Sequence, residues 1–186
     1  METIVVRIAS LILLIALLPI LFLVAIIILL FDGFPIIFVQ KRVGQNNNHF
    51  WIYKFRTMKK DMEDIATHLL KDKDSVYILF GPLLRKLSLD ELPQLINILK
   101  GDMTFIGPRP ALYNQSDLIE LRTQSGIHKL MPGVTGWAQV NGRDKLSIHD
   151  KVKMDEYYLN NKTVWLDIKI IFMTLKKAIK AEDVLH

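Results

Sequence analysis

The chain begins with a long apolar segment. Every residue from Ile8 to Phe31 is apolar except Ser10. As a helix this segment is about 36 Å long, enough for a hydrocarbon core of roughly 30 Å. Because proline removes a helical hydrogen bond, Pro19 predicts a kink or a break near the middle. The pattern predicts a retained membrane anchor at residues 1–33, either a kinked spanning helix or a re-entrant helix–break–helix.

Alternating residues after the anchor predict a β-hairpin. Pro35–Val39 and Phe50–Arg56 have the pattern of two strands, joined by the polar loop 44–48. The two-residue period of a strand places Lys54 and Arg56 side by side on one face. These two cations indicate either a solvated face or part of an anion-binding site.

Two further stretches have the spacing of amphipathic helices. Residues 58–73 carry apolar side chains at helical intervals among many charges, which predicts a surface helix. Apolar residues from Trp165 to Ile179 also recur at helical spacing, with lysines on the remaining turns. This last helix is predicted to lie either in the core or on a membrane surface.

Charge and composition narrow the classes of function. The chain has 24 Lys and Arg against 19 Asp and Glu, and this net charge of +5 suits anionic lipid headgroups, a phosphorylated ligand or nucleic acid. The chain lacks cysteine, which excludes disulfides, thiolate catalysis and cysteine-containing zinc sites. Basic residues lie overwhelmingly after the apolar segment, beginning with Lys41 and Arg42. We therefore expect residues 34–186 on the cytoplasmic side of the membrane.

The stretch 85–95 is the most informative for chemistry. Ser88 and Glu91 have the spacing of a capping box, in which acidic residues only satisfy free N–H groups at a helix start. Alternatively, the helix begins near Pro93 as its first residue. Both versions leave Asp90 and Glu91 at a helix N-terminus, where the backbone dipole favours ionised carboxylates. A nucleophilic carboxylate or a Mg²⁺ ligand must be in that form.

Two loops rich in glycine and proline carry further candidates. In the loop 107–110, prolines on either side of Arg109 restrict the backbone and present one arginine rigidly. The planar guanidinium suits a phosphate, and we favour this role over the alternative of a tight loop with an incidental exposed arginine. The loop 132–143 offers glycines, an aromatic ring and Asn and Arg donors. It is either a nucleotide-cradling loop or a plain glycine-rich connection.

Taken in order, these segments resemble the small monotopic phosphoglycosyl transferases, bacterial sugar transferases that initiate glycan assembly on polyprenyl phosphate. Besides the anchor with its proline, the resemblance rests on residues 53–58, 87–95, 101–110, 132–136, 139–143 and 155–158. It implies an α+β, mainly helical fold with a small β-hairpin and amphipathic interfacial helices. It also implies a re-entrant anchor broken at Pro19 at the cytoplasmic face of the bacterial inner membrane, although Leu18 replaces the small polar residue that often precedes this proline.

The implied activity is transfer of a sugar-1-phosphate from a UDP-sugar to polyprenyl (undecaprenyl) phosphate, giving polyprenyl-diphosphate-sugar and UMP. The resemblance makes Asp90 the covalent nucleophile and Glu91 its partner, with Mg²⁺ bound by the same two carboxylates. It matches Arg85, Arg109 and Asp155 to further active-site positions, and Asp155 either shares the metal or orients a cation. We add as candidate phosphate or nucleotide contacts Lys54, Arg56, Gly142 and Arg143.

Two other functions remain open at the level of sequence. A membrane-tethered adaptor that binds lipid or nucleic acid explains the anchor and the charge, but not the two motifs around Asp90 and Arg109. A membrane phosphatase or pyrophosphatase would use the same aspartate with water as the acceptor. The transferase hypothesis implies a UDP-sugar, polyprenyl phosphate and membrane lipids as partners, and no nucleic acid. The identity of the sugar, the glycan and the oligomeric state stay open, a homodimer included.

Overall fold

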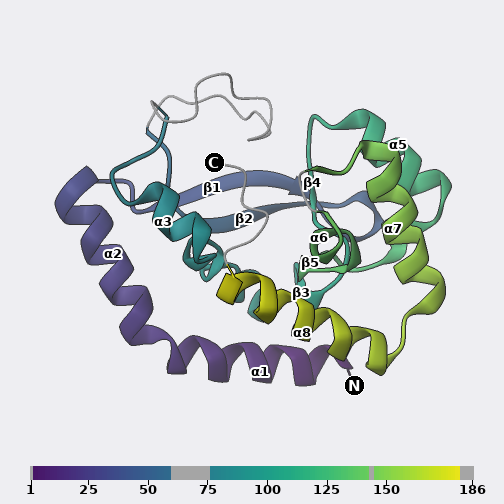
Figure 1. Ribbon diagram of the computed structural model, residues 1–186, viewed down its shortest axis with the longest axis horizontal. Coiled ribbons are helices and arrows are strands. Elements are labelled where there is room, and N and C mark those ends of the chain that lie inside the picture. The colour runs from purple at the N-terminus through teal and green to yellow at the C-terminus, as the bar shows by residue number, and fades with distance from the viewer. Residues whose placement is uncertain (1, 60–75, 143–144, 181–186) are drawn as a thin grey trace.

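The computed structural model describes residues 2–59, 76–142 and 145–180, which form helices around two small sheets (Figure 1). The helices are α1 (Glu2–Ala16), α2 (Leu18–Asp32), α3 (Gly81–Lys86), α4 (Gln94–Lys100), α5 (Ser116–Gln124), α6 (Trp137–Val140), α7 (Ile148–Asn161) and α8 (Val164–Lys180). The strands are β1 (Ile37–Val43), β2 (His49–Phe55), β3 (Thr104–Ile106), β4 (Ala111–Leu112) and β5 (Gly133–Thr135). The predicted α+β, mainly helical class is confirmed, whereas the helix predicted over 58–73 lies almost wholly outside the described residues.

The apolar segment is broken, as Pro19 predicts. α1 ends at Ala16 and α2 begins at Leu18, with Pro19 in the first turn of α2, where its missing N–H removes no helical bond. Among the described residues no single helix is both long and apolar enough to cross a membrane. The pair Ile4–Ala16 and Leu18–Asp32 meets that criterion jointly, by length and composition, with a bend of 60° between them.

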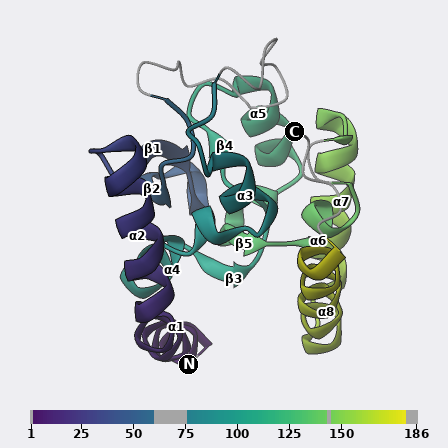
Figure 2. The ribbon, with the colours of Figure 1, turned by 60° about the vertical axis from the view of Figure 1, so that its left-hand side comes forward.

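Both helices of this segment pack against the rest of the chain. Ser10, the polar exception in the apolar segment, is buried on α1 and donates its Oγ–H to the Leu95 carbonyl of α4 at 2.8 Å. On α2, Val24 and Ile28 are buried in one cluster with Phe55 at the end of β2. Figure 2 shows α1 and α2 on one side of the strands and α7 and α8 on the other.

The predicted hairpin is present. β1 and β2 pair antiparallel, with Gln40 opposite Ile52, and β4 adds a third strand beside Arg42 and Val43. The first strand extends beyond its predicted end at Val39, because β2 pairs with it through the polar positions as far as Val43, where β4 also pairs. The free side of β2 is also bound, since Asn97 of α4 bonds to two backbone groups of that strand.

The strand before the loop 107–110 pairs with the start of the loop 132–143. β3 and β5 form a parallel two-stranded sheet, with Thr104 beside Gly133 and Ile106 beside Thr135. The backbones approach so closely that a Cβ atom at Gly133 would lie 2.1 Å from the Gly107 nitrogen. Glycine is therefore required here by space. The sequence predicted two loops here but not this parallel pairing.

The helix predicted near the C-terminus is present as α8, with one side buried and one apolar side exposed. Ile170 is buried in a cluster with Val140 and Tyr158. The larger apolar residues on the other side of α8 are exposed, and Trp165 reaches 80% exposure. Because the described part of the chain leaves this apolar face uncovered, the core alternative applies only to the narrow side around Ile170.

The packing around α4 gives a first prediction. Ile98 is fully buried against Ile52, Leu95 and Met103, whereas Ile96 on the same helix is 40% exposed. Ile98→Ala should lower the free energy of unfolding by about 2–5 kcal/mol, because it leaves a cavity in this cluster. Chemical unfolding followed by circular dichroism measures the change. Ile96→Ala is the matched control, and an equal loss in the two variants would contradict the packing described here.

Candidate active site

The two adjacent carboxylates lie in a 3-10 turn, Leu89–Glu91, directly before α4. Ser88 precedes the turn with a left-handed φ of 55° and makes no side-chain capping bond, so the capping box is not formed. Pro93 occupies the cap position of α4, close to the alternative start near this proline. Asp90 and Glu91 are 8% and 9% exposed, so their charges act in a partly desolvated environment.

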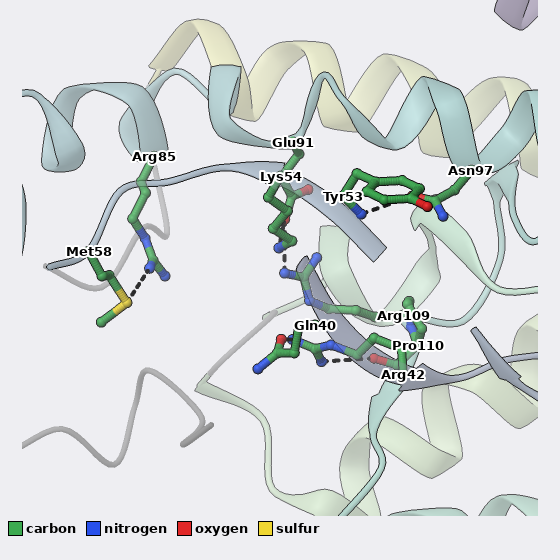
Figure 3. Close-up of polar contacts among 10 residues, drawn as sticks. All are labelled: Gln40, Arg42, Tyr53, Lys54, Met58, Arg85, Glu91, Asn97, Arg109 and Pro110. Atoms are coloured by element: carbon green, nitrogen blue, oxygen red, sulfur yellow. Dashed lines mark hydrogen bonds and ion pairs between the residues drawn. The ribbon is translucent and has the colours of Figure 1, made fainter. Parts of the chain in front are cut away.

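Glu91 joins two cations from separate segments (Figure 3). Its Oε1 atom accepts hydrogen bonds from Lys54 Nζ and from an Arg109 guanidinium nitrogen, each at 2.9 Å. Lys54 comes from β2, and Arg109 comes from the loop between β3 and β4. The structure thereby brings together three of the predicted site residues that are far apart in sequence.

The environment of Lys54 changes its acidity. Burial lowers the pKa of Lys54 from 10.5 to about 8, because desolvation disfavours the charged ammonium. The Glu91 and Asp90 carboxylates raise this pKa, while Arg109 and Arg42 lower it. The Asp90 carboxylate therefore interacts electrostatically with Lys54, and with a pKa of about 8 Lys54 changes charge near that pH.

Two consecutive backbone carbonyls, those of Arg109 and Pro110, accept hydrogen bonds from other arginines. Arg122 of α5 donates to the Arg109 carbonyl at 2.8 Å, and Arg42 of β1 donates to the Pro110 carbonyl at 3.1 Å. Figure 3 shows Arg42 below Arg109, next to Gln40, which it also contacts. The loop that presents Arg109 is thus attached to both β1 and α5.

Asp155 is a residue of α7, and its side chain is almost fully buried, at 1% exposure. Its Oδ2 atom accepts two hydrogen bonds from Arg122, at 3.1 and 2.6 Å. Burial raises the pKa of Asp155 above its usual range, and the Arg122 charge opposes that rise. Of the two roles considered for Asp155, this contact corresponds to orienting a cation.

Two other predicted candidates, Arg56 and Arg85, make contacts with other parts of the chain. Arg56 is buried and donates to the Asp32 and Gly33 carbonyls at 2.8 Å, so it caps the end of α2. These contacts differ from that of Lys54, whose Nζ atom bonds to Glu91. Arg85 approaches Met58 Sδ at 3.8 Å and lies over the Tyr77 ring at 5.5 Å.

Two further candidates follow β5. Gly142 has a φ of 152°, and a Cβ atom there would lie 2.8 Å from the Leu146 side chain. Its role in the structure is to allow this backbone conformation and this close approach. Arg143 lies outside the described residues.

Sequence reasoning missed three residues that organise the site. Arg42 and Arg122 have no local pattern that separates them from surface arginines. Asn97 does carry a signal, since it stands between Ile96 and Ile98 in an apolar stretch and is fully buried. Its amide donates to the Trp51 carbonyl at 2.7 Å and accepts from the Tyr53 N–H at 3.0 Å, which fixes α4 against β2.

The Asp90 and Glu91 carboxylates fit a Mg²⁺ site in which the substrate supplies the other ligands. Within residues 2–59, 76–142 and 145–180, no three His, Cys, Asp or Glu side chains gather as a complete ligand set. Mg²⁺, however, is commonly held by one or two carboxylates together with the phosphates of a substrate. The adjacent acids Asp90 and Glu91 match that donor set, whereas they are too few for a structural cation held by protein alone.

Comparisons with known proteins find matches over most of the chain. The model of the bacterial sugar transferase family matches residues 1–181. The chain is 43% identical over 152 residues to EpsL, an uncharacterized sugar transferase of Bacillus subtilis (strain 168), covering 82% of this chain and 74% of that protein. It is 42% identical over 182 residues to the undecaprenyl-phosphate glucose phosphotransferase of Komagataeibacter xylinus, covering 92% of this chain and 34% of that protein.

A third relative is the UDP-glucose:undecaprenyl-phosphate glucose-1-phosphate transferase of Escherichia coli (strain K12). It is 38% identical over 166 residues, which cover 86% of this chain and 36% of that protein. The chain therefore spans about a third of the length of these two undecaprenyl-phosphate transferases. The match to the family model extends over both the apolar segment and the residues around Glu91. The chain belongs to the bacterial sugar transferase family.

Proposed function

We propose that this chain transfers a sugar-1-phosphate from a UDP-sugar to undecaprenyl phosphate and releases UMP. The observation that carries the proposal is the convergence of Lys54 and Arg109 on Glu91, next to Asp90. This arrangement holds a carboxylate beside cations, as an enzyme needs when a negatively charged nucleophile attacks an anionic diphosphate. The names of the Komagataeibacter and Escherichia relatives support the same substrate classes.

The transfer has two displacements at one phosphorus atom. An Asp90 carboxylate oxygen attacks the β-phosphorus of the UDP-sugar, and the bond from that phosphorus to the bridging oxygen breaks, so that UMP leaves with the electron pair. A phosphate oxygen of undecaprenyl phosphate then attacks the same phosphorus and displaces the Asp90 carboxylate. Two displacements allow the two anionic substrates to react one after the other.

The cations around Glu91 bind and orient the donor. The Arg109 side chain is 31% exposed, so a phosphate in solution can approach it beside its contact with Glu91. Lys54 adds a second positive charge from β2. Asp90 and Glu91 would hold Mg²⁺, which when bound supplies charge neutralisation at the phosphate oxygens.

The membrane arrangement is part of the same proposal. Residues 1–33 would form a re-entrant anchor, and residues 34–186 a catalytic domain at the cytoplasmic face of the inner membrane. The 60° bend between the two apolar helices and the exposed apolar face of α8, with Trp165 and Phe172, support this arrangement. A shallow position suits the reaction, because the phosphate of the lipid carrier lies at the level of the headgroups.

Replacement of the nucleophile tests the chemistry. Asp90→Asn should lower the rate of UMP release by about 10⁴-fold or more, since an amide cannot form the acyl phosphate. Purified protein is assayed with Mg²⁺, undecaprenyl phosphate and a panel of UDP-sugars. Asp117→Asn, an exposed change on α5, is the control and should retain activity. Normal UMP release by Asp90→Asn would contradict the two-displacement scheme.

Mass measurement separates the transferase from a hydrolase. Without the lipid acceptor, the wild-type chain should gain the mass of a phosphosugar, and Asp90→Asn should not. With the acceptor present, the product should be lipid-linked. Free sugar phosphate in its place would identify water as the acceptor and would favour the phosphatase alternative.

The pKa of Lys54 gives a pH dependence. As pH rises through about 8, Lys54 loses its positive charge, so kcat/KM should fall on the alkaline side, about tenfold per pH unit. Lys54→Arg should move this fall to higher pH, because a guanidinium stays protonated. Lys100→Arg, at a lysine whose pKa is raised, is the control and should keep the wild-type profile. An identical alkaline limb in Lys54→Arg would rule Lys54 out as its cause.

A further inference from the structure

Arg122 connects a buried carboxylate on one helix to the backbone of Arg109. Its Nε and one terminal nitrogen donate to Asp155 Oδ2 at 3.1 and 2.6 Å. Its other terminal nitrogen donates to the Arg109 carbonyl at 2.8 Å. A guanidinium is planar and rigid, so fixing two of its nitrogens on Asp155 also fixes the direction of the third.

The Arg122–Asp155 ion pair is expected to fix geometry more than to add stability. Burying two charges costs hydration energy, and this cost largely cancels their attraction, so a buried ion pair adds little net stability. The pair still holds the two side chains in one orientation, whatever its net contribution to stability. Asp155 and Arg122 are both almost fully buried, at 1% and 11% side-chain exposure. The pair therefore acts as a fixed brace between α7, α5 and the loop of Arg109.

The same loop is held from a second direction. Arg42 of β1 donates to the carbonyl of Pro110, the residue that follows Arg109. Pro108 and Pro110 restrict the backbone on either side. With its backbone fixed in this way, Arg109 extends its guanidinium to Glu91 Oε1 at 2.9 Å. The placement of that guanidinium therefore depends on contacts made by its own backbone.

We propose that Arg122 is a positioning residue for the transfer, supported by Asp155, and that it acts only through Arg109. This inference rests on the proposed function, in which Arg109 contacts the transferred phosphate. Asp155 then affects the transfer indirectly: it fixes Arg122, and Arg122 fixes the backbone of Arg109. A small displacement of a catalytic group is enough to reduce the rate, since a shift of about 1 Å can cost about 100-fold.

A double-mutant cycle tests the proposal. Arg122→Lys keeps a positive charge near Asp155, but a single ammonium cannot reproduce the fork that reaches both Asp155 and the Arg109 carbonyl. Its kcat for UMP release should fall by about 100-fold, with little change in KM for the UDP-sugar, because the lost interaction belongs to the transition state. In an Arg109→Ala background, Arg122→Lys should have no further effect on kcat.

The controls separate positioning from stability. Glu120→Gln, at an exposed acid on the same helix α5, should retain wild-type kinetics. If Arg122→Lys fails to fold, the paired variant Arg122→Leu/Asp155→Leu removes the ion pair without leaving a buried charge unpaired. This variant should fold, as judged by circular dichroism, and should show the same fall in kcat. Wild-type kcat in it, or effects of Arg109→Ala and Arg122→Lys that multiply in the cycle, would overturn the proposal.

A spectroscopic measurement distinguishes failure of this inference from failure of the proposed function. The Nε–H signal of Arg109, identified by its loss in Arg109→Ala, should shift or broaden in Arg122→Lys and stay unchanged in Glu120→Gln. This measurement needs no turnover. Absence of UMP release by the wild type, with an Arg109 signal that responds to Arg122, would overturn the proposed function alone. An Arg109 signal unaffected by Arg122→Lys would overturn the brace.

Discussion

One carboxylate oxygen, Glu91 Oε1, joins three segments of the chain that no local sequence pattern relates. Lys54 and Arg109 would repel each other without it, and both are at least partly shielded from water, where their repulsion is stronger than at an open surface. Their shared contact lets two cations persist beside Asp90. The left-handed Ser88, the hairpin and the loop of Arg109 all serve to place groups around this atom.

Helix α4 connects the acidic turn to the rest of the fold through contacts on two sides. On one side its Asn97 bonds to the backbone of β2, the strand that carries Lys54. On the other side its Leu95 carbonyl accepts from Ser10 of α1. The acidic turn before α4 is therefore fixed between the hairpin and the apolar segment. Arg122 and Asp155 fix the opposite partner, Arg109, from α5 and α7.

Much of this could be predicted from sequence, because the features concerned are local. Strand alternation predicted the hairpin and Pro19 predicted the break, while the family resemblance implied that Asp90, Glu91 and Arg109 belong to one site. Features that depend on distant contacts were not predicted. The pairing of β3 with β5, the cap that Arg56 makes on α2 and the brace through Arg122 each need a partner far along the chain. A lone arginine carries no periodicity that reveals such a partner.

The packing of α2 limits how the molecule can be handled. Val24 and Ile28 lie in one core cluster with Phe55, and Leu89, the neighbour of Asp90, packs against the same cluster. Deleting the first 33 residues would therefore remove the Val24 and Ile28 side chains from the cluster against which Leu89 packs, next to Asp90. A soluble design has to keep these inward side chains and replace only outward ones, such as Phe22 and Leu30, with polar residues.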